Sequence, residues 1–169
     1  MSTGRFQMSV ELPGYISHIP TPTRGKLYLG SVSSINEVNR LDIKYVVSLF
    51  PVNDIVGIDH DIFSIIDTTD NTTLAKMNAI LDIINNKIYT HLNEGHNVLV
   101  HCFAGISRST TVVVDTLLRY FPEVFVTDVH TKDRRDVYEA IKYVAKYRPV
   151  IEPNHGFKDL LIVRYLTRI

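Results

Sequence analysis

The chain has 169 residues, of which 45% are hydrophobic and 21% are charged, a balance that suits one globular domain around a single core. Lys and Arg together number 18, as do Asp and Glu, which argues against a nucleic-acid or membrane partner. No apolar run approaches the roughly 20 residues that span a bilayer, and residues 1–10 do not resemble a signal peptide. With one cysteine there is no internal disulfide, so a cytoplasmic or nuclear location is expected.

The first half of the chain reads as an irregular arm followed by strands and one long helix. Residues 1–23 contain Pro13, Pro20 and Pro22 and are predicted to be an irregular N-terminal arm, with the domain covering residues 24–169. Short apolar runs bounded by turn residues predict buried strands at 27–29, 45–50, 62–66 and 98–100. Apolar residues then recur every three or four positions over 74–92, which predicts an amphipathic helix that ends at Gly95.

The second half is predicted to be helical. Asp136 and Glu139 have capping-box spacing ahead of an apolar helix that Pro149 ends, and Asn154 can cap a last helix. The five residues 110–114 are all β-branched and would favour a strand, but the motif before them predicts a buried central helix. Strands that alternate with helices and then give way to helices alone predict a single-domain α/β fold with a mostly parallel central sheet.

The segment "VLVHCFAGISRS" at residues 98–109 carries the chemistry. A buried strand ends at His101, and Cys102 is followed by a loop of small and apolar residues before Arg108. Such a loop can turn successive backbone N–H groups toward one centre at the start of a helix, where they bind an anion and favour the thiolate form of Cys102. Arg108 offers a planar fork for two phosphate oxygens, and Ser109 can donate a hydrogen bond to the sulfur.

At these residues the sequence resembles a known family. His-Cys, five residues and then Arg-Ser is the signature of the protein tyrosine phosphatase superfamily, and "HCFAGISRS" resembles its small dual-specificity branch. The segments "LYLGS", "YVVSLF" and "RPVIEPNHGF" are similar to dual-specificity segments in the same order. The resemblance implies a protein-tyrosine-phosphatase-like fold, a nucleophile at Cys102, phosphate binding by Arg108, and assistance to hydrolysis by Ser109. Loop amides that bind phosphate would come from Phe103, Ala104, Gly105, Ile106 and Ser107.

The family takes the proton for the leaving oxygen from an Asp on the loop after the third strand, and "IIDTTDNTTL" offers Asp67 and Asp70. The separation from Cys102 along the sequence favours Asp70 as the proton donor. The separations from the preceding strand and from the following helix favour Asp67, which we prefer, with Asp70 as the alternative. The other aspartate would be an exposed turn or capping residue. His101 is expected to orient the loop, and Asn154 to cap a helix.

Two segments depart from the family pattern. Residues 121–136 are longer than usual and carry Val124, Phe125, Val126 and Val129, which we expect to pack on the core. Some relatives dimerise through N-terminal arms, so homodimer formation through this arm is a hypothesis. Asp115, Arg119 and the basic run 132–135 are expected on solvated faces.

Three functions compete at the loop. The first is a protein phosphatase acting on phosphotyrosine and on phosphoserine or phosphothreonine in phosphoprotein substrates, with no cofactor, no metal and no nucleic-acid or membrane partner. The second is an RNA 5′-triphosphatase or phosphoinositide phosphatase, but relatives with such highly charged substrates carry basic residues in the loop, where this chain has Phe103, Ala104 and Ile106. The third is a non-enzymatic phosphoprotein-binding module, which the intact Cys102 and Arg108 argue against.

Overall fold

A five-stranded sheet forms the centre of the computed structural model, which describes residues 11–125 and 134–166. Its order is β1-β2-β5-β3-β4. β1 runs antiparallel to β2 at one edge, and the other three pairings are parallel, which confirms the predicted mostly parallel α/β sheet. The strands are β1 (Ile16–Ile19), β2 (Leu27–Gly30), β3 (Ile43–Ser48), β4 (Asp59–Ile62) and β5 (Asn97–His101).

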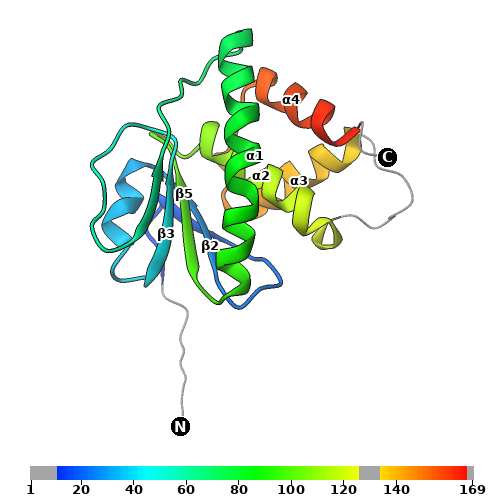
Figure 1. The fold of residues 1–169 in the computed structure, drawn as a ribbon. Helices are drawn as coiled ribbons and strands as arrows, with labels where there is room; N and C mark the ends of the chain where they lie inside the picture. The colour runs from blue at the N-terminus through cyan, green and yellow to red at the C-terminus, as the bar shows by residue number, and fades with distance from the viewer. Residues whose placement is uncertain (1–10, 126–133, 167–169) are drawn as a thin grey trace.

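Four α-helices lie on one side of the sheet, and a short 3₁₀ helix, η2 (Val32–Glu37), lies on the other (Figure 1). The α-helices are α1 (Asn71–Asn93), α2 (Arg108–Tyr120), α3 (Arg134–Tyr147) and α4 (His155–Leu166), and η3 (Pro122–Val124) follows α2. Within the described ranges, no helix combines the length and apolar character needed to cross a membrane.

Strand β5 is buried on both faces because it lies at the middle of the sheet. Val98 and Val100 belong to the large core between the sheet and the helices, whereas Leu99 belongs to a smaller core with Tyr28 and Val46. Parallel strands covered on both faces read as continuous apolar runs rather than alternating ones. The strand predicted from the apolar run 98–100 is therefore confirmed as part of β5.

Helix α2 is buried over its whole β-branched run. Residues 110–114 are all fully buried, and α2 contacts α1, α3, α4 and β5. Packing of this extent outweighs the tenths of a kcal/mol per residue by which β-branched residues disfavour a helix. The hydroxyl of Thr111 donates to the carbonyl of Ser107, and that of Thr116 donates to Val112. The prediction of a buried central helix here is confirmed.

Two edge strands were missed or misplaced. The third predicted strand, 62–66, is wrong in position, because β4 is Asp59–Ile62 and Ile66 is 61% exposed. The edge strand β4 pairs only with β3 and has the polar sequence DHDI, so no apolar pattern reveals it. The predicted irregular arm is likewise wrong for Ile16–Ile19, which form β1; only the two terminal isoleucines of this short edge strand are buried.

The helix predictions are confirmed for α1, α3 and α4, although α3 begins at Arg134, so Asp136 lies in its first turn and is not the predicted cap. The environment of Asp115 was not foreseen. Asp115 is completely buried on α2, where Arg164 and Tyr165 of α4 both donate to its carboxylate. The predicted solvated position is therefore wrong, whereas Arg119 is exposed as expected. In the segment after α2, Val124 and Phe125 pack against the large core as predicted. Val126, Val129 and the side chains of 132–135 lie outside the described residues.

Candidate active site

The sulfur of Cys102 lies at the base of a loop between β5 and α2. Cys102 follows the last residue of β5 and is 2% exposed. Its Sγ accepts a hydrogen bond from the Gly105 amide at 3.2 Å and lies 3.1 Å from the Ser109 hydroxyl. The strand end, the loop and the first turn of α2 therefore converge on one sulfur atom, as the motif predicted.

The carbonyl groups of this loop are held by partners outside it. Four successive carbonyls accept hydrogen bonds, those of Phe103 from Val32, of Ala104 and Gly105 from Arg148, and of Ile106 from Glu152. The C=O and the N–H of one peptide group point in opposite directions. Because these carbonyls point out of the loop, the amide that follows each of them points into it. Within the described residues, the amides of Ala104, Ile106 and Ser107 have no protein acceptor. Such an arrangement of unpaired amides at the start of a helix is suited to an anion.

Gly105 permits this turn because its φ is +70°. A Cβ at this position would lie 2.5 Å from the carbonyl carbon of Gly30 and 2.7 Å from Nη2 of Arg148. Both the left-handed backbone and the close approach of β2 therefore require glycine. A side chain here would push the loop away from the strand that supports it.

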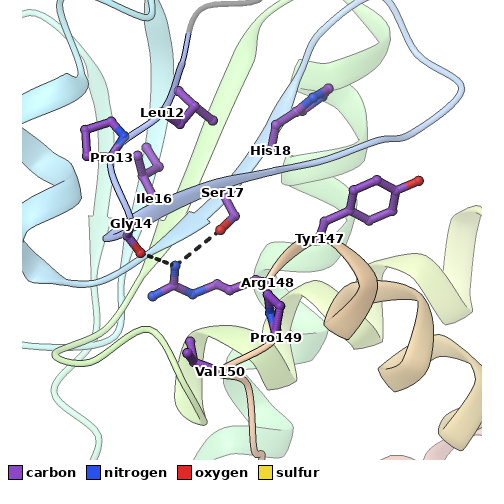
Figure 2. A pocket seen from close by; sticks show the side chains of 10 residues that line it. All are labelled: Leu12, Pro13, Gly14, Ile16, Ser17, His18, Tyr147, Arg148, Pro149 and Val150. Carbon is purple, nitrogen blue, oxygen red and sulfur yellow. Dashed lines mark hydrogen bonds between the residues drawn. The ribbon is translucent and has the colours of Figure 1, made fainter.

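Arg148, which follows α3, is the residue that sequence reasoning missed. Its Nε donates to the Gly105 carbonyl at 2.8 Å and its Nη2 to the Ala104 carbonyl at 3.3 Å, while Nη1 donates to Gly14 and Ser17 before and within β1. Figure 2 shows the guanidinium reaching from the end of α3 to β1. Burial lowers the pKa of Arg148, and the charge of the nearby Cys102 opposes that effect. An arginine before the proline that ends a helix resembles an ordinary surface residue, so no local pattern marked Arg148 as a support of the catalytic loop.

Arg108 is the first residue of α2, and its guanidinium contacts residues that follow β3 and β4. Its Nη1 donates to the Ile65 carbonyl at 2.9 Å, and its Cζ lies 5.7 Å from the centroid of the Phe50 ring. The Phe50 ring is in turn 5.2 Å from that of Phe103, which is 56% exposed. One guanidinium nitrogen is therefore fixed, and two others remain for a phosphate group.

Asp67 lies against the loop, as the prediction preferred. Its Oδ1 accepts hydrogen bonds from the Ser107 hydroxyl at 2.6 Å and from the Asn154 side-chain amide at 2.8 Å. Asp67 is exposed, and its Oδ2 has no hydrogen-bond partner among the described residues. The Asn154 oxygen accepts from the Phe157 amide at 2.8 Å, which confirms Asn154 as the cap of α4. This cap also fixes one oxygen of Asp67 and leaves the other open.

Asp70 is instead the N-cap of α1. Its carboxylate accepts a hydrogen bond from the Thr73 amide at 2.9 Å, and the hydroxyls of Thr68 and Thr73 donate to its other oxygen. The hydrogen bond from Thr68, followed by that from the Thr73 amide, lowers the pKa of Asp70. A carboxyl group that is held as an anion by these donors is poorly suited to give up a proton at neutral pH.

His101 joins a chain of hydrogen bonds behind the loop. The Ile55 amide donates to Nδ1 of His60, and Nε2 of His60 lies 2.8 Å from the Ser48 hydroxyl. The Ser48 hydroxyl lies 2.6 Å from Nε2 of His101, whose Nδ1 bonds to the Cys102 carbonyl. Burial lowers the pKa of His101 to about 4, so its ring is neutral at pH 7. This neutral ring can orient the Cys102 peptide, the role that was predicted for it.

These groups together provide the parts of phosphoryl transfer from a monoester. They are a sulfur nucleophile, inward amides for a dianion, a guanidinium fork, and a carboxyl oxygen free to exchange a proton. Among the described residues, the clustered His, Cys, Asp and Glu side chains that could hold a metal include neither Cys102 nor Asp67.

Residues 27–165 match the protein family described as dual specificity phosphatase, catalytic domain. The chain belongs to this family. Protein 123R of Invertebrate iridescent virus 6, a tyrosine phosphatase by name, is 29% identical over 138 residues, 82% of this chain and 86% of that protein. Dual specificity protein phosphatase 15 of Homo sapiens is 47% identical over 68 residues, which are 40% of this chain and 19% of the human protein.

A solved phosphatase domain also shares the fold. The crystal structure of the Yvh1 phosphatase domain from Chaetomium thermophilum matches with a TM-score of 0.72 at 24% identity, covering 88% of this chain and 94% of that domain. At this identity the likeness establishes the fold alone. The family match establishes a cysteine-dependent phosphatase, and the predicted family and fold class are both confirmed.

Proposed function

We propose that this dual-specificity phosphatase hydrolyses phosphotyrosine and phosphoserine or phosphothreonine in proteins through a covalent phosphocysteine at Cys102. The observation that carries the proposal is the position of the sulfur, which receives hydrogen bonds inside a loop whose carbonyls are all held outward. The amides of the loop and the Arg108 fork would bind the three terminal phosphate oxygens. Charge on those oxygens is then stabilised without reorganisation during the reaction.

The reaction has two steps in this proposal. The thiolate attacks phosphorus, the bond from phosphorus to the leaving oxygen breaks, and that oxygen takes a proton from Oδ2 of Asp67. Water then attacks the phosphocysteine, the Asp67 carboxylate takes a proton from the water, and the sulfur leaves while Ser109 donates a hydrogen bond to it. The products are the dephosphorylated hydroxyl and inorganic phosphate, and the enzyme returns to its starting state.

The apolar rim supports a protein substrate over a polyphosphate. Phe50 and Phe103 form an aromatic pair beside Arg108, and Phe103 is more than half exposed. An exposed ring can pack against the side chain that bears the phosphate, best against the ring of phosphotyrosine. RNA 5′-triphosphate and phosphoinositide substrates would need cationic groups at Phe103, Ala104 or Ile106, so we do not favour these alternatives.

A substrate panel tests this function. Wild-type protein should release phosphate from an aryl phosphate and from phosphotyrosine and phosphothreonine peptides, and should leave RNA 5′-triphosphate and a phosphoinositide largely intact. The Cys102→Ser variant should bind the same peptides without turnover, because the amides and Arg108 remain. Faster release from either non-protein substrate than from every phosphopeptide would overturn the substrate class, and turnover by Cys102→Ser would overturn the nucleophile.

Phosphoproteins are the partners that this proposal requires. Homodimer formation through residues 1–23 stays a prediction, as does a location in the cytoplasm or the nucleus.

A further inference from the structure

A second cluster of chemically active side chains lies at the other end of β5 from Cys102. His91 is in the last turn of α1, Glu94 caps the C-terminus of that helix, and His96 immediately precedes β5. Gly95 between them has a φ of +87°, which lets the chain reverse sharply and brings the three side chains to one place. Figure 1 shows the end of α1 meeting the start of β5, at the end of the strand away from the catalytic loop.

The three ligand atoms of this cluster are close enough to share one ion. They lie within 4.8 Å of one another, with Nδ1 of His91 2.9 Å from Nδ1 of His96 and Oε1 of Glu94 3.8 Å from Nδ1 of His96. Ligands around a tetrahedral zinc ion are about 3.3 Å apart, so small side-chain movements suffice. Because His96 and Glu94 are 41% and 58% exposed, an ion can reach the cluster from solvent.

The surroundings of His91 fix its ring in the orientation that a metal ligand needs. Its Nε2 lies 2.9 Å from Oδ2 of Asp59, whose other oxygen is 3.0 Å from the Lys87 ammonium. The ring also stacks on buried Tyr45, with centroids 4.6 Å apart. A carboxylate that accepts from one imidazole nitrogen selects the tautomer in which the other nitrogen has a free lone pair, as around protein-bound zinc. Here that free nitrogen, Nδ1, is the one that faces His96 and Glu94.

We propose that His91, Glu94 and His96 form a binding site for a transition-metal ion, Zn²⁺ in the first place, separate from the catalytic loop. Two imidazoles and one carboxylate suit zinc and its neighbours, and exclude the all-oxygen coordination that calcium and magnesium prefer. Water would take the fourth position. The ion would join the end of α1 to the start of β5, and the site does not depend on the proposed phosphatase function.

Zinc titration of chelator-treated protein tests the site. The Cys102→Ser variant serves as the background because a thiolate binds the same metals. Calorimetry should give one ion per chain, and a hundredfold excess of free Zn²⁺ over Kd should raise the Tm by roughly 5–10 °C. Co²⁺ should bind with a visible spectrum that lacks thiolate charge-transfer bands.

Three further substitutions in that background locate the ion. His96→Ala should abolish the Tm shift, and Glu94→Gln, at an exposed position that should not disturb folding, should weaken binding at least tenfold. His18→Gln, which removes another half-buried histidine, should change neither. Absence of saturable binding would overturn the proposal, as would binding that Glu94→Gln and His96→Ala leave unchanged.

Discussion

Asp67 and Asp70 are close in sequence and both exposed, but their carboxylates accept hydrogen bonds from different elements. Those of Asp70 come from the first turn of α1 and the residues before it, so its role is complete within the helix cap. Those of Asp67 come from the catalytic loop and the cap of α4, and both reach the same oxygen. The second oxygen of Asp67 is left open, which is why we propose Asp67 rather than Asp70 as the proton donor.

Asp67→Asn should separate the two aspartates by chemistry. The amide is nearly isosteric and cannot donate an acidic proton, so kcat for substrates with poor leaving groups should fall by roughly 10²–10³-fold. Activated aryl phosphates should be nearly unaffected, and the basic limb of the pH profile should flatten. A set of aryl phosphates with leaving groups of different pKa measures this.

Asp70→Ala is the matched control. Loss of an N-cap should lower the Tm by roughly 2–4 °C, and the dependence of rate on the leaving group should stay as in wild type. If Asp70→Ala, and not Asp67→Asn, steepened that dependence, the assignment of the proton donor would be wrong.

His101 should make stability fall in mild acid. The unfolded chain binds a proton at this ring with a pKa near 6.5, whereas the pKa in the folded protein is about 4 because the ring is buried. Stability is therefore complete above pH 6.5 and declines as pH falls toward 4, by about 3 kcal/mol from this group. Denaturant unfolding at several pH values, in wild type and His101→Asn, isolates the contribution. Parallel pH curves for the two proteins would contradict it.

At the scale of elements, the catalytic loop is held by segments far apart in the sequence. Gly30 of β2 is adjacent to Gly105, the Val32 amide at the start of η2 donates to the Phe103 carbonyl, and Arg148 links the loop to β1. An edge strand and the end of α3 are thereby connected to the loop through one guanidinium. We infer that Arg148 positions the loop and does not touch the substrate.

Arg148→Met should disturb the loop without removing a reacting group. The carbonyls of Ala104 and Gly105 would lose their donor, and a misplaced loop should lower kcat/KM roughly 10²-fold. Inhibition by inorganic phosphate should weaken as well, which a role confined to global stability would not cause. Ser17→Ala removes one outer contact of Arg148 and should stay within about threefold of wild type. Unchanged phosphate inhibition in Arg148→Met would refute this role.

Elements with a strong local signal could be predicted from the sequence, and edge elements could not. The long helix α1, the cap at Asn154 and the central strand β5 each have an apolar period, a capping residue or a buried run. β1 and β4 are short edge strands, and β4 has hardly any apolar residues. Arg148 and Asp115 depend on contacts from distant segments, which no local pattern encodes.

At the scale of the whole molecule, the two ends of β5 have different chemistry. The carboxyl end leads into Cys102 and the amide-lined loop, and the amino end follows the His91, Glu94 and His96 cluster. A buried pair, Asp115 and Arg164, joins α2 to α4 behind the loop. This pair adds to the packing of α2 against α1, α3 and β5, so the helix that begins at Arg108 gives the loop a rigid support.

The covalent intermediate at Cys102 is the central claim, and acid quench during turnover tests it most directly. Protein mixed with excess aryl phosphate is denatured within the first turnovers, digested, and analysed by mass spectrometry. The Cys102 peptide should carry one phosphoryl group, more of it in Ser109→Ala, where the second step is slowed, and none should be found in Cys102→Ser. Steady phosphate release with no phosphorylated Cys102 peptide in either active protein would contradict the account.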